Sequence, residues 1–248
     1  ERLERDLAGI RPAGAPLIWV HCASLGEFEQ GRPVIEALRK TLPDCKILLT
    51  FFSPSGYEVR KNYEQADLVT YLPADTPARA RRFVEIANPD LAIFVKYEFW
   101  YHHLRTLQRR GTPTLLISAL FRPGQVFFRW YGGLFRRLLP SFDRIFVQNE
   151  GSADLLDQLG LDNYVRSGDT RIDRVLSIAE EKRSFPLVEA FAAGSRVLVA
   201  GSTWPADEAL LAELAEQELT PAWKIILAPH EVREDHLRDI ERAFPLPS

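Results

Sequence analysis

The apolar run Leu91-Ala92-Ile93-Phe94-Val95 decides the fold class of this 248-residue chain. Its residues are continuously apolar, whereas a strand with one solvated face would alternate apolar and polar side chains. Asp90 precedes the run, and a helical pattern follows it to about residue 110. The run therefore predicts a strand that is buried on both faces of a parallel sheet and is followed by a crossover helix.

The same strand-then-helix unit recurs along the first two thirds of the chain. Short apolar runs bounded by turn residues predict further strands at residues 17–22, 46–51, 68–72, 114–118 and 144–148. Helical patterns lie between and after them, at residues 27–40, 55–65, 76–87, 98–110, 125–139 and 150–159. This alternation predicts a Rossmann-like α/β domain with right-handed crossovers.

The pattern pauses after Gly168-Asp169-Thr170 and then resumes. A charged helix to about residue 183 precedes a strand at 196–200, a helix at 206–219, a strand at 223–228 and a helix at 232–244. We therefore expect one complete domain over residues 1–170. Residues 171–248 would form a linker and the beginning of a second α/β domain.

The composition is that of a globular protein, with 46% hydrophobic and 26% charged residues, and excludes wholesale disorder. Cys22 and Cys45 cannot form a disulfide scaffold and lack the spacing of a zinc site, which favours a reducing compartment. The longest apolar runs are far shorter than the roughly 18–20 residues that span a bilayer. No signal peptide opens the chain, and no methionine occurs in it.

The turn after the first predicted strand reads His21-Cys22-Ala23-Ser24-Leu25-Gly26-Glu27. In open α/β sheets ligands bind beyond the carboxyl ends of the strands, so this turn is a candidate site. Glu27 falls in the first turn of the next helix, where it either acts as a catalytic base or merely complements the helix dipole. The spacing is not the GxGxxG pattern of a dinucleotide site.

The turn after the fourth strand places Lys96 and Glu98 at the same sheet edge as Glu27. Two carboxylates at neighbouring strand ends can serve as a base and a positioning partner. The equally weighted alternative is a Lys96–Glu98 ion pair. His102 and His103 are adjacent and point about 100° apart on a helix, so we expect no metal site.

Seven arginines and no acidic residue lie between Phe99 and Phe142, in a chain whose net charge is -3. Within this stretch, residues 121–139 interleave six aromatic residues with four arginines, among them Arg122 and Arg129. Such a segment suits nucleic acid or an anionic membrane surface; the alternative is an amphipathic helix with its aromatic residues in the core. The missing counter-charges favour a phosphate-rich partner.

In the second half, Ser202 and Thr203 occupy a small-residue turn between a strand and a helix. The free N–H groups of such a helix can hold a phosphate. His230 and Glu231 repeat the placement after the next strand, although a single histidine there is more often structural.

Together these motifs resemble the Kdo (3-deoxy-D-manno-octulosonic acid) transferases of lipid A assembly, over residues 17–235. The resemblance rests first on the hallmark turn His21-x-x-Ser24-x-Gly26-Glu27. Further motifs follow in the family's order: Glu98-Phe99-Trp100, Gln148-Asn149-Glu150, Gly168-Asp169, Gly201-Ser202-Thr203 and Pro229-His230.

The resemblance implies a GT-B glycosyltransferase with two Rossmann-like domains, an acceptor domain at residues 1–170 and a donor domain beginning at 171–248. Glu27 would deprotonate a hydroxyl of the lipid A precursor, which attacks the anomeric carbon of Kdo and displaces CMP with inversion. Acceptor contacts would come from Ser24, Gly26, Lys96, Glu98, Arg122 and Arg129, and donor contacts from Ser202, Thr203, His230 and Glu231.

The resemblance further implies CMP-Kdo as donor substrate, no metal or other cofactor, and no nucleic acid partner. The enzyme would work at the cytoplasmic face of the bacterial inner membrane. The family's membrane-anchoring segment and its later glycine-rich donor motifs have no counterpart in the 248 residues, so we expect this chain alone to be inactive. Two alternatives stay open, a GT-B enzyme with another nucleotide sugar and a non-catalytic module that binds anionic lipid.

Overall fold

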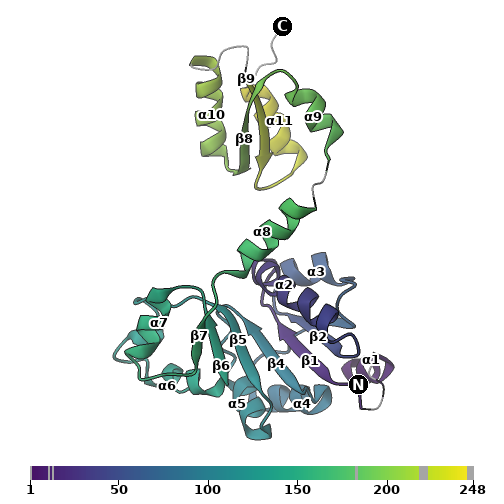
Figure 1. Ribbon diagram of the computed structural model, residues 1–248, viewed down its shortest axis with the longest axis vertical. Coiled ribbons are helices and arrows are strands. Elements are labelled where there is room, and N and C mark those ends of the chain that lie inside the picture. Colours follow the sequence, from purple (N-terminus) through teal and green to yellow (C-terminus); the bar gives the residue numbers. More distant parts are fainter. Residues whose placement is uncertain (1, 11, 13, 182–183, 218–222, 245–248) are drawn as a thin grey trace. The chain divides into compact units, whose positions relative to one another are not determined.

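The computed structural model describes residues 2–10, 12, 14–181, 184–217 and 223–244. The chain divides into two compact units, Glu1–Glu181 and Lys182–Ser248, which we call the N-terminal and the C-terminal unit (Figure 1). The first unit extends beyond the boundary that we expected at residue 170. The reason is that helix α8, Thr170–Glu180, packs against helix α2, Leu25–Thr41.

The N-terminal unit is built on a parallel sheet with the strand order β3-β2-β1-β4-β5-β6-β7. Its strands are β1 Leu17–His21, β2 Lys46–Phe51, β3 Leu68–Tyr71, β4 Leu91–Val95, β5 Thr114–Ala119, β6 Arg144–Val147 and β7 Tyr164–Arg166. All five residues of β1 are buried. Two core clusters, one on each face of the sheet, account for this burial and confirm the predicted α/β class.

Helices cover both faces of this sheet (Figure 1). Helix α2 and helix α3, Pro54–Arg60, pack on one face around Phe28 and Ile35. The other face is covered by α1 Arg2–Ile10, α4 Pro77–Ala87, α5 Tyr101–Arg110 and α7 Glu150–Asp157. Because the strands are parallel, the turns that follow them lie together at the carboxyl edge of the sheet, which is the predicted location of the ligand site.

The predicted helix over residues 125–139 is wrong. The segment forms three short pieces, the 3-10 turns η1 Val126–Phe128 and η2 Leu139–Ser141 and the single-turn helix α6 Gly133–Arg136. Gly132 explains the break, because a Cβ at this position would lie 1.8 Å from the carbonyl oxygen of Val126. The backbone folds back on itself there more tightly than a continuous helix allows.

Other differences are smaller. Helix α5 begins at Tyr101 and not at residue 98, because the carboxylate of Asp75 accepts hydrogen bonds from the backbone N–H groups of His102 and His103. Strand β7 and helices α1 and α9 had no predicted counterpart. None of the helices in the described part of the chain combines the length and apolar character that a membrane span requires.

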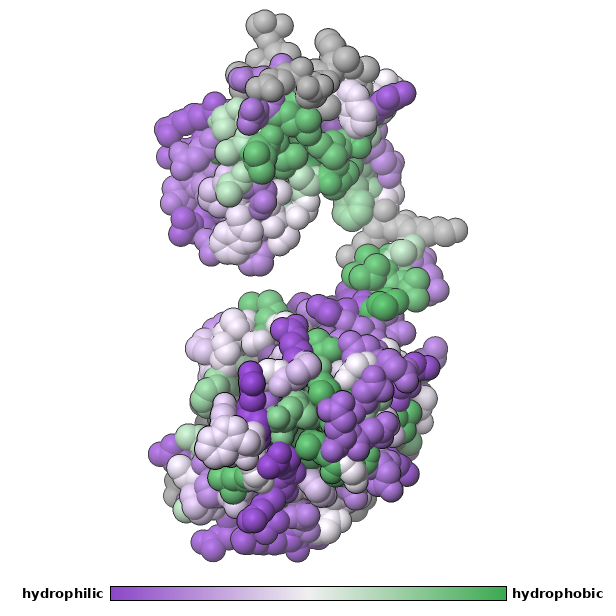
Figure 2. All heavy atoms as spheres, turned by 90° about the vertical axis from the view of Figure 1, so that its left-hand side faces the viewer, coloured by the Kyte–Doolittle hydropathy of each residue, from purple (hydrophilic) through white to green (hydrophobic). Residues whose placement is uncertain are grey.

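The C-terminal unit contains a two-stranded parallel sheet of β8 Arg196–Thr203 and β9 Trp223–Pro229. Its helices are α9 Pro186–Ala192, α10 Pro205–Gln217 and α11 Glu234–Ala243. Among the residues described here, none of its hydrophobic side chains is fully buried. Apolar side chains instead gather on one face of the unit (Figure 2).

Candidate active site

The turn between β1 and α2 holds Glu27 through a capping box. Ser24 is the N-cap residue of α2, and its backbone N–H donates a hydrogen bond to Glu27 Oε2 at 2.8 Å. The Ser24 hydroxyl donates to the same oxygen. Glu27 therefore stabilises the start of α2, where the alternative to a catalytic role was that it complements the helix dipole. The capping box fixes Oε2 at the carboxyl edge of the sheet and leaves Oε1 outside the box.

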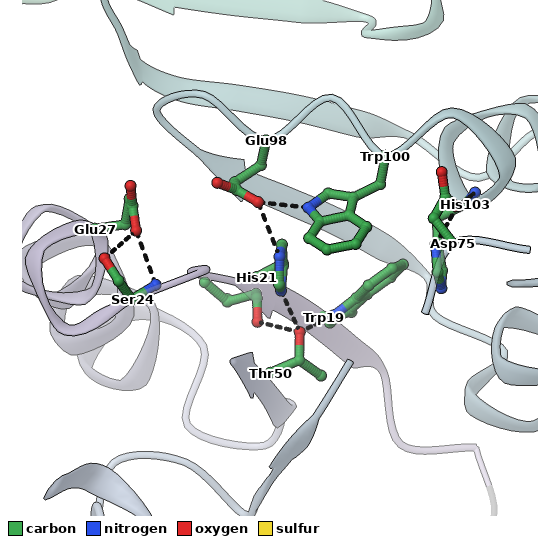
Figure 3. Close-up of polar contacts among 10 residues, drawn as sticks. Trp19, His21, Ser24, Glu27, Thr50, Asp75, Glu98, Trp100 and His103 are labelled. Carbon is green, nitrogen blue, oxygen red and sulfur yellow. Dashed lines mark hydrogen bonds and ion pairs between the residues drawn. The ribbon is translucent and has the colours of Figure 1, made fainter. Parts of the chain in front are cut away.

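The turn between β4 and α5 brings the second carboxylate to the same edge, because β4 is the parallel neighbour of β1. Glu98 is 7% exposed, and its Oε2 lies 3.1 Å from Nε2 of the buried His21 (Figure 3). The indole N–H of Trp100 donates to the same oxygen. The alternative Lys96–Glu98 ion pair does not form in the described structure, and the Lys96 ammonium lies 5.3 Å from the ring centre of Tyr97.

The thiol of Cys22 is close enough to both carboxylates to be affected by their charges. Burial raises the pKa of its thiol well above the usual value, and the negative charges of Glu27 and Glu98 raise it further. A thiol held protonated in this way is a poor nucleophile and a poor metal ligand. Of the groups at this edge, the carboxylates rather than the thiol are therefore the candidates for acid–base chemistry.

The Gly168-Asp169-Thr170 junction contacts residues of α2 and β5 near the same edge. Asp169 caps α8 and also accepts a hydrogen bond from the Gln30 side chain at 3.2 Å. Burial alone would raise the pKa of Asp169, but hydrogen bonds from Arg171 and Gln30 outweigh it and lower the pKa. The Thr170 hydroxyl contacts both the Gln30 carbonyl and the Ser118 hydroxyl. The junction thus links α2, β5 and α8 next to the carboxylates.

Three non-glycine residues at strand ends adopt left-handed backbone conformations: Lys96 with φ 73°, Ser118 with φ 52° and Ser202 with φ 59°. Lys96 directly follows β4, Ser118 is the penultimate residue of β5, and Ser202 is the penultimate residue of β8. Strained backbone of this kind clusters at functional sites in proteins.

In the C-terminal unit, the structure brings Ser202 and His230 together. The Ser202 hydroxyl lies 2.7 Å from His230 Nδ1, and the imidazole stacks on Trp204 with ring centres 4.6 Å apart. Thr203 is buried and donates a hydrogen bond to Glu208. The Glu231 carboxylate forms an exposed ion pair with Arg233 at 3.8 Å.

The start of α10 is less available to a phosphate than its sequence indicated. The Asp207 carboxylate already accepts the backbone N–H of Trp204 at 2.9 Å. Both Asp207 and Glu208 lie in the first helical turn, where their negative charges oppose a bound anion. Ser202 and His230 therefore remain the better-placed candidates for contact with a phosphate in this unit.

Metal-binding geometry is absent from the described residues, in that no three His, Cys, Asp or Glu side chains converge. His103, half of the adjacent histidine pair, points into the core, where its Nδ1 lies 2.8 Å from Asp75.

The N-terminal region matches the family model of the 3-deoxy-D-manno-octulosonic-acid transferases over residues 1–174. The chain belongs to the Kdo transferase family.

Curated Kdo transferases are similar along most of the chain. The enzyme from Bordetella pertussis is 29% identical over 238 residues, which cover 90% of this chain and 54% of that protein. The enzyme from Aquifex aeolicus is 27% identical over 219 residues, covering 87% of this chain and 55% of that protein. The chain thus spans about half the length of the Kdo transferases that it matches.

Solved structures give the fold. The UDP-GlcNAc 2-epimerase of Neisseria meningitidis superimposes with a TM-score of 0.62 at 18% identity, covering 92% of this chain and 69% of that one. MurG of Acinetobacter baumannii gives a TM-score of 0.54 at 10% identity, covering 93% and 62%. The predicted GT-B fold class is thereby confirmed for this Kdo transferase family member.

The residues that hold the Glu98 carboxylate of this Kdo transferase chain were not predicted from the sequence. His21, Thr50 and Trp100 were not proposed as site residues, yet they connect β1, β2 and the β4–α5 turn. A signal was present: His21 ends an otherwise apolar strand, and a polar side chain in a buried strand needs a hydrogen-bonding partner.

Proposed function

We propose that this chain forms the acceptor side, and the beginning of the donor side, of an inverting enzyme that transfers Kdo from CMP-Kdo to a lipid A precursor. The observation that carries the proposal is the fixed carboxylate of Glu27 at the carboxyl edge of the sheet, within the residues that match the Kdo transferase family. In doubly wound folds this edge is where substrates bind.

In the proposed reaction Glu27 is the general base. Its carboxylate takes the proton of an acceptor hydroxyl while the hydroxyl oxygen forms a bond to the anomeric carbon of Kdo. The bond from that carbon to the phosphate oxygen of CMP breaks, and its electron pair leaves with CMP. Attack opposite the leaving group inverts the anomeric centre. The capping box holds Oε2, so Oε1 is the oxygen that we expect to receive the proton.

We propose that the acceptor is a phosphorylated glycolipid presented at the cytoplasmic face of a bacterial inner membrane. Support comes from the segment of residues 121–137. Trp130 is 90% exposed and Tyr131 61%, and the guanidinium groups of Arg129 and Arg136 bond only backbone carbonyls within the described contacts. Exposed aromatic rings and unpaired arginines suit the boundary between phosphate headgroups and acyl chains.

Roles for the remaining predicted residues follow from this arrangement. We assign Ser24, Gly26, Lys96 and Glu98, with Arg122 and Arg129, to the acceptor. Ser202 and His230 would contact the phosphate of CMP, and Thr203 and Glu231 would act nearby. For Thr203 the buried hydrogen bond to Glu208 favours a supporting role.

The decisive experiment measures Kdo transfer from CMP-Kdo to a tetra-acylated lipid A precursor by the full-length protein and its Glu27→Gln variant. Glutamine can also serve at the third position of a capping box, so the helix start is kept while the base is removed. We expect turnover to fall by about 10²–10⁴-fold while lipid binding is retained.

The matched control is Glu36→Gln, on the same helix but in a solvent-facing ion pair with Arg32. It should transfer Kdo like the parent protein. Equal turnover by the Glu27→Gln variant would move the base elsewhere, with Glu98 the next candidate. A parent protein that binds the lipid without transferring Kdo would favour another nucleotide sugar, and failure to bind the lipid would refute the proposal.

Membrane binding is tested separately, by co-sedimentation with vesicles that contain the lipid A precursor. Replacing Arg122 and Arg129 together by alanine should weaken binding, whereas the matched pair Arg79→Ala and Arg81→Ala on α4 should not. Raising the salt concentration should weaken the binding of the parent protein, since the attraction is electrostatic. Equal effects of the two double variants would contradict the assignment of this segment.

A further inference from the structure

His21 has no part in the proposed reaction, yet its side chain is fully buried beside the Glu98 carboxylate. Its exposed fraction is 0%, and both ring nitrogens are engaged. Nδ1 lies 2.8 Å from Thr50 Oγ1, and Nε2 lies 3.1 Å from Glu98 Oε2. Phe94 and Trp100 pack edge-on against the ring and fix its orientation. The imidazole therefore connects strand β2 to the carboxylate across strand β1.

The direction of the hydrogen bonds assigns the proton on this ring. The indole of Trp19 can only donate, and its Nε1–H donates to Thr50 Oγ1 at 2.8 Å. The Thr50 hydroxyl must then place its own hydrogen on another acceptor. His21 Nδ1 is 2.8 Å away, whereas the Val20 carbonyl oxygen is 3.5 Å away. The shorter contact makes Nδ1 an acceptor, so the ring carries its proton on Nε2.

The proton on His21 Nε2 in turn makes Glu98 Oε2 a hydrogen-bond acceptor. Glu98 Oε2 receives Nε2–H from His21 and the indole N–H from Trp100, both of which are donors. Both lone pairs of Oε2 are thereby engaged, so this oxygen carries no proton. The chain of hydrogen bonds from Trp19 through Thr50 and His21 to Glu98 thus runs in one direction, and no group in it conflicts with its neighbour (Figure 3).

Among the residues that the structure describes, the contacts of the Glu98 carboxylate are made by Oε2 and not by Oε1. Oε1 of Glu98 points away from His21, toward the side on which Glu27 lies (Figure 3). A carboxylate that is 7% exposed needs fixed donors, since a buried charge without hydrogen bonds is strongly destabilised. His21 and Trp100 supply these donors at Oε2 alone. Oε1 is consequently held in place as an acceptor for a group that arrives from outside.

We propose that Glu98 is ionised and that His21 is a positioning residue: as the Nε2–H tautomer it holds Glu98 so that Oε1 accepts a hydrogen bond from a sugar hydroxyl of the acceptor. This inference rests on the proposed function for the nature of the acceptor. The tautomer and the hold on Glu98 do not depend on it.

The first test is a double-mutant cycle on Kdo transfer by the full-length protein. His21→Phe keeps an aromatic ring in the packing but removes both nitrogens, and we expect kcat to fall by about 10²-fold through misplacement of Glu98, with the KM for CMP-Kdo little changed. His21→Gln, whose amide N–H can still donate to Glu98, should retain more activity than His21→Phe. In a Glu98→Gln background, His21→Phe should have little further effect on kcat.

Independent, multiplicative effects of the His21 and Glu98 substitutions would overturn the proposal, as would a His21→Gln variant no better than His21→Phe. Folding of the His21 variants is checked by thermal unfolding, and Glu36→Gln, whose ion pair with Arg32 lies outside the network, should behave like the parent protein. If the parent protein itself transfers no Kdo, the function proposal fails, and the second test then decides on His21.

The second test needs no activity. The 248-residue chain contains five histidines, and 15N labelling of their rings reports which nitrogen of each carries the proton. The His21 signals, identified by their loss in His21→Gln, should show a proton on Nε2 and none on Nδ1 at neutral pH. A proton on Nδ1, alone or together with one on Nε2, would overturn the assignment.

Discussion

The two units of this chain follow the same strand–turn–helix pattern in sequence but differ in what they bury. Every fully buried hydrophobic side chain in the described structure lies in the N-terminal unit, between Leu7 and Leu156. In the C-terminal unit the buried residues are polar, Thr203 and Glu208, while Val199 in strand β8 is 67% exposed. The pattern of a strand therefore does not determine its burial. A parallel strand is enclosed only where neighbouring strands and helices cover both faces, as they do for β1 but not for the two-stranded sheet.

The largest expected effect contrasts two valines at equivalent places in this pattern. Val20 in β1 is fully buried, whereas Val199 in β8 is mostly exposed. Val20→Ala should lower the free energy of unfolding of the N-terminal unit by about 2–3 kcal/mol, since it removes buried apolar surface and leaves a cavity. Val199→Ala should change the stability of the C-terminal unit by less than about 0.5 kcal/mol.

The cysteines report on the N-terminal unit in this experiment, because Cys22 and Cys45 are both buried there. Burial raises the pKa of both thiols, so thiol reagents should label them only on unfolding in urea. Hydrogen exchange of β8 and β9 reports on the other unit. Similar decreases in the free energy of unfolding for Val20→Ala and Val199→Ala would contradict the difference in burial between the two units.

A second contrast lies within the N-terminal unit, between neighbouring glycines. A Cβ on Gly132 would meet the Val126 carbonyl oxygen at 1.8 Å, whereas one on Gly133 would meet only the tip of the Arg136 side chain at 3.8 Å. Gly132→Ala should lower the free energy of unfolding by about 1–3 kcal/mol because the turn must shift. Gly133→Ala should be nearly neutral. Thermal unfolding of the two variants measures the difference, and equal melting temperatures would refute the tight turn.

The smallest effects concern one histidine–carboxylate pair in each unit, and their pH dependences have opposite signs. In the N-terminal unit, burial alone would raise the pKa of Asp75, but hydrogen bonds from the His103 ring and from the backbone of His102 and His103 lower it. A lowered pKa stabilises the fold above the unfolded value of about 3.9, and this stabilisation is lost as the pH falls further. Asp75→Asn should cost about 0.5–1 kcal/mol at pH 7, since solvent screens the partly exposed carboxylate. In urea unfolding, its difference from the parent should shrink below about pH 4.

In the C-terminal unit, the hydrogen bond to Glu208 is the main cause that raises the pKa of His236. A raised pKa stabilises the unit fully below the unfolded value of about 6.5, and this stabilisation is lost as the pH rises through the folded value. Hydrogen exchange of α11, corrected for the intrinsic rates, should therefore speed up from pH 6 to pH 9. His236→Gln should abolish this dependence, and a parent protein without it would contradict the pairing.

The same contrast explains how much of the fold was predictable from sequence. The six strands predicted in the N-terminal unit all form, because runs such as Leu91–Val95 are both apolar and bounded by turn residues. Strand β7 was not predicted, because it has only three residues, Tyr164–Arg166, and the exposed Val165 and Arg166 form no apolar run. The helix predicted at 125–139 does not form. The backbone at Gly132 approaches the Val126 carbonyl oxygen too closely for any side chain, and the periodicity of the sequence does not reveal this contact.

The candidate site was predictable in position but not in its support. Parallel pairing of β1 with β4 follows from the fold class, and it places Glu27 and Glu98 at one edge, as predicted. Their catalytic and binding roles stay predictions. The contacts of His21 with Thr50 and Glu98 join residues 29 and 77 positions apart, and local sequence patterns carry no information on such pairs.

The left-handed backbone of Lys96, Ser118 and Ser202 has a consequence for protein engineering. Each residue keeps a side chain in a conformation that glycine adopts without penalty, at a cost of about 1 kcal/mol or more. A redesign that ranks substitutions by stability alone would introduce glycine at these positions. It would then remove a lysine and two hydroxyl groups from the turns where we expect substrates to bind, and the gain in stability would come with a loss of the proposed contacts.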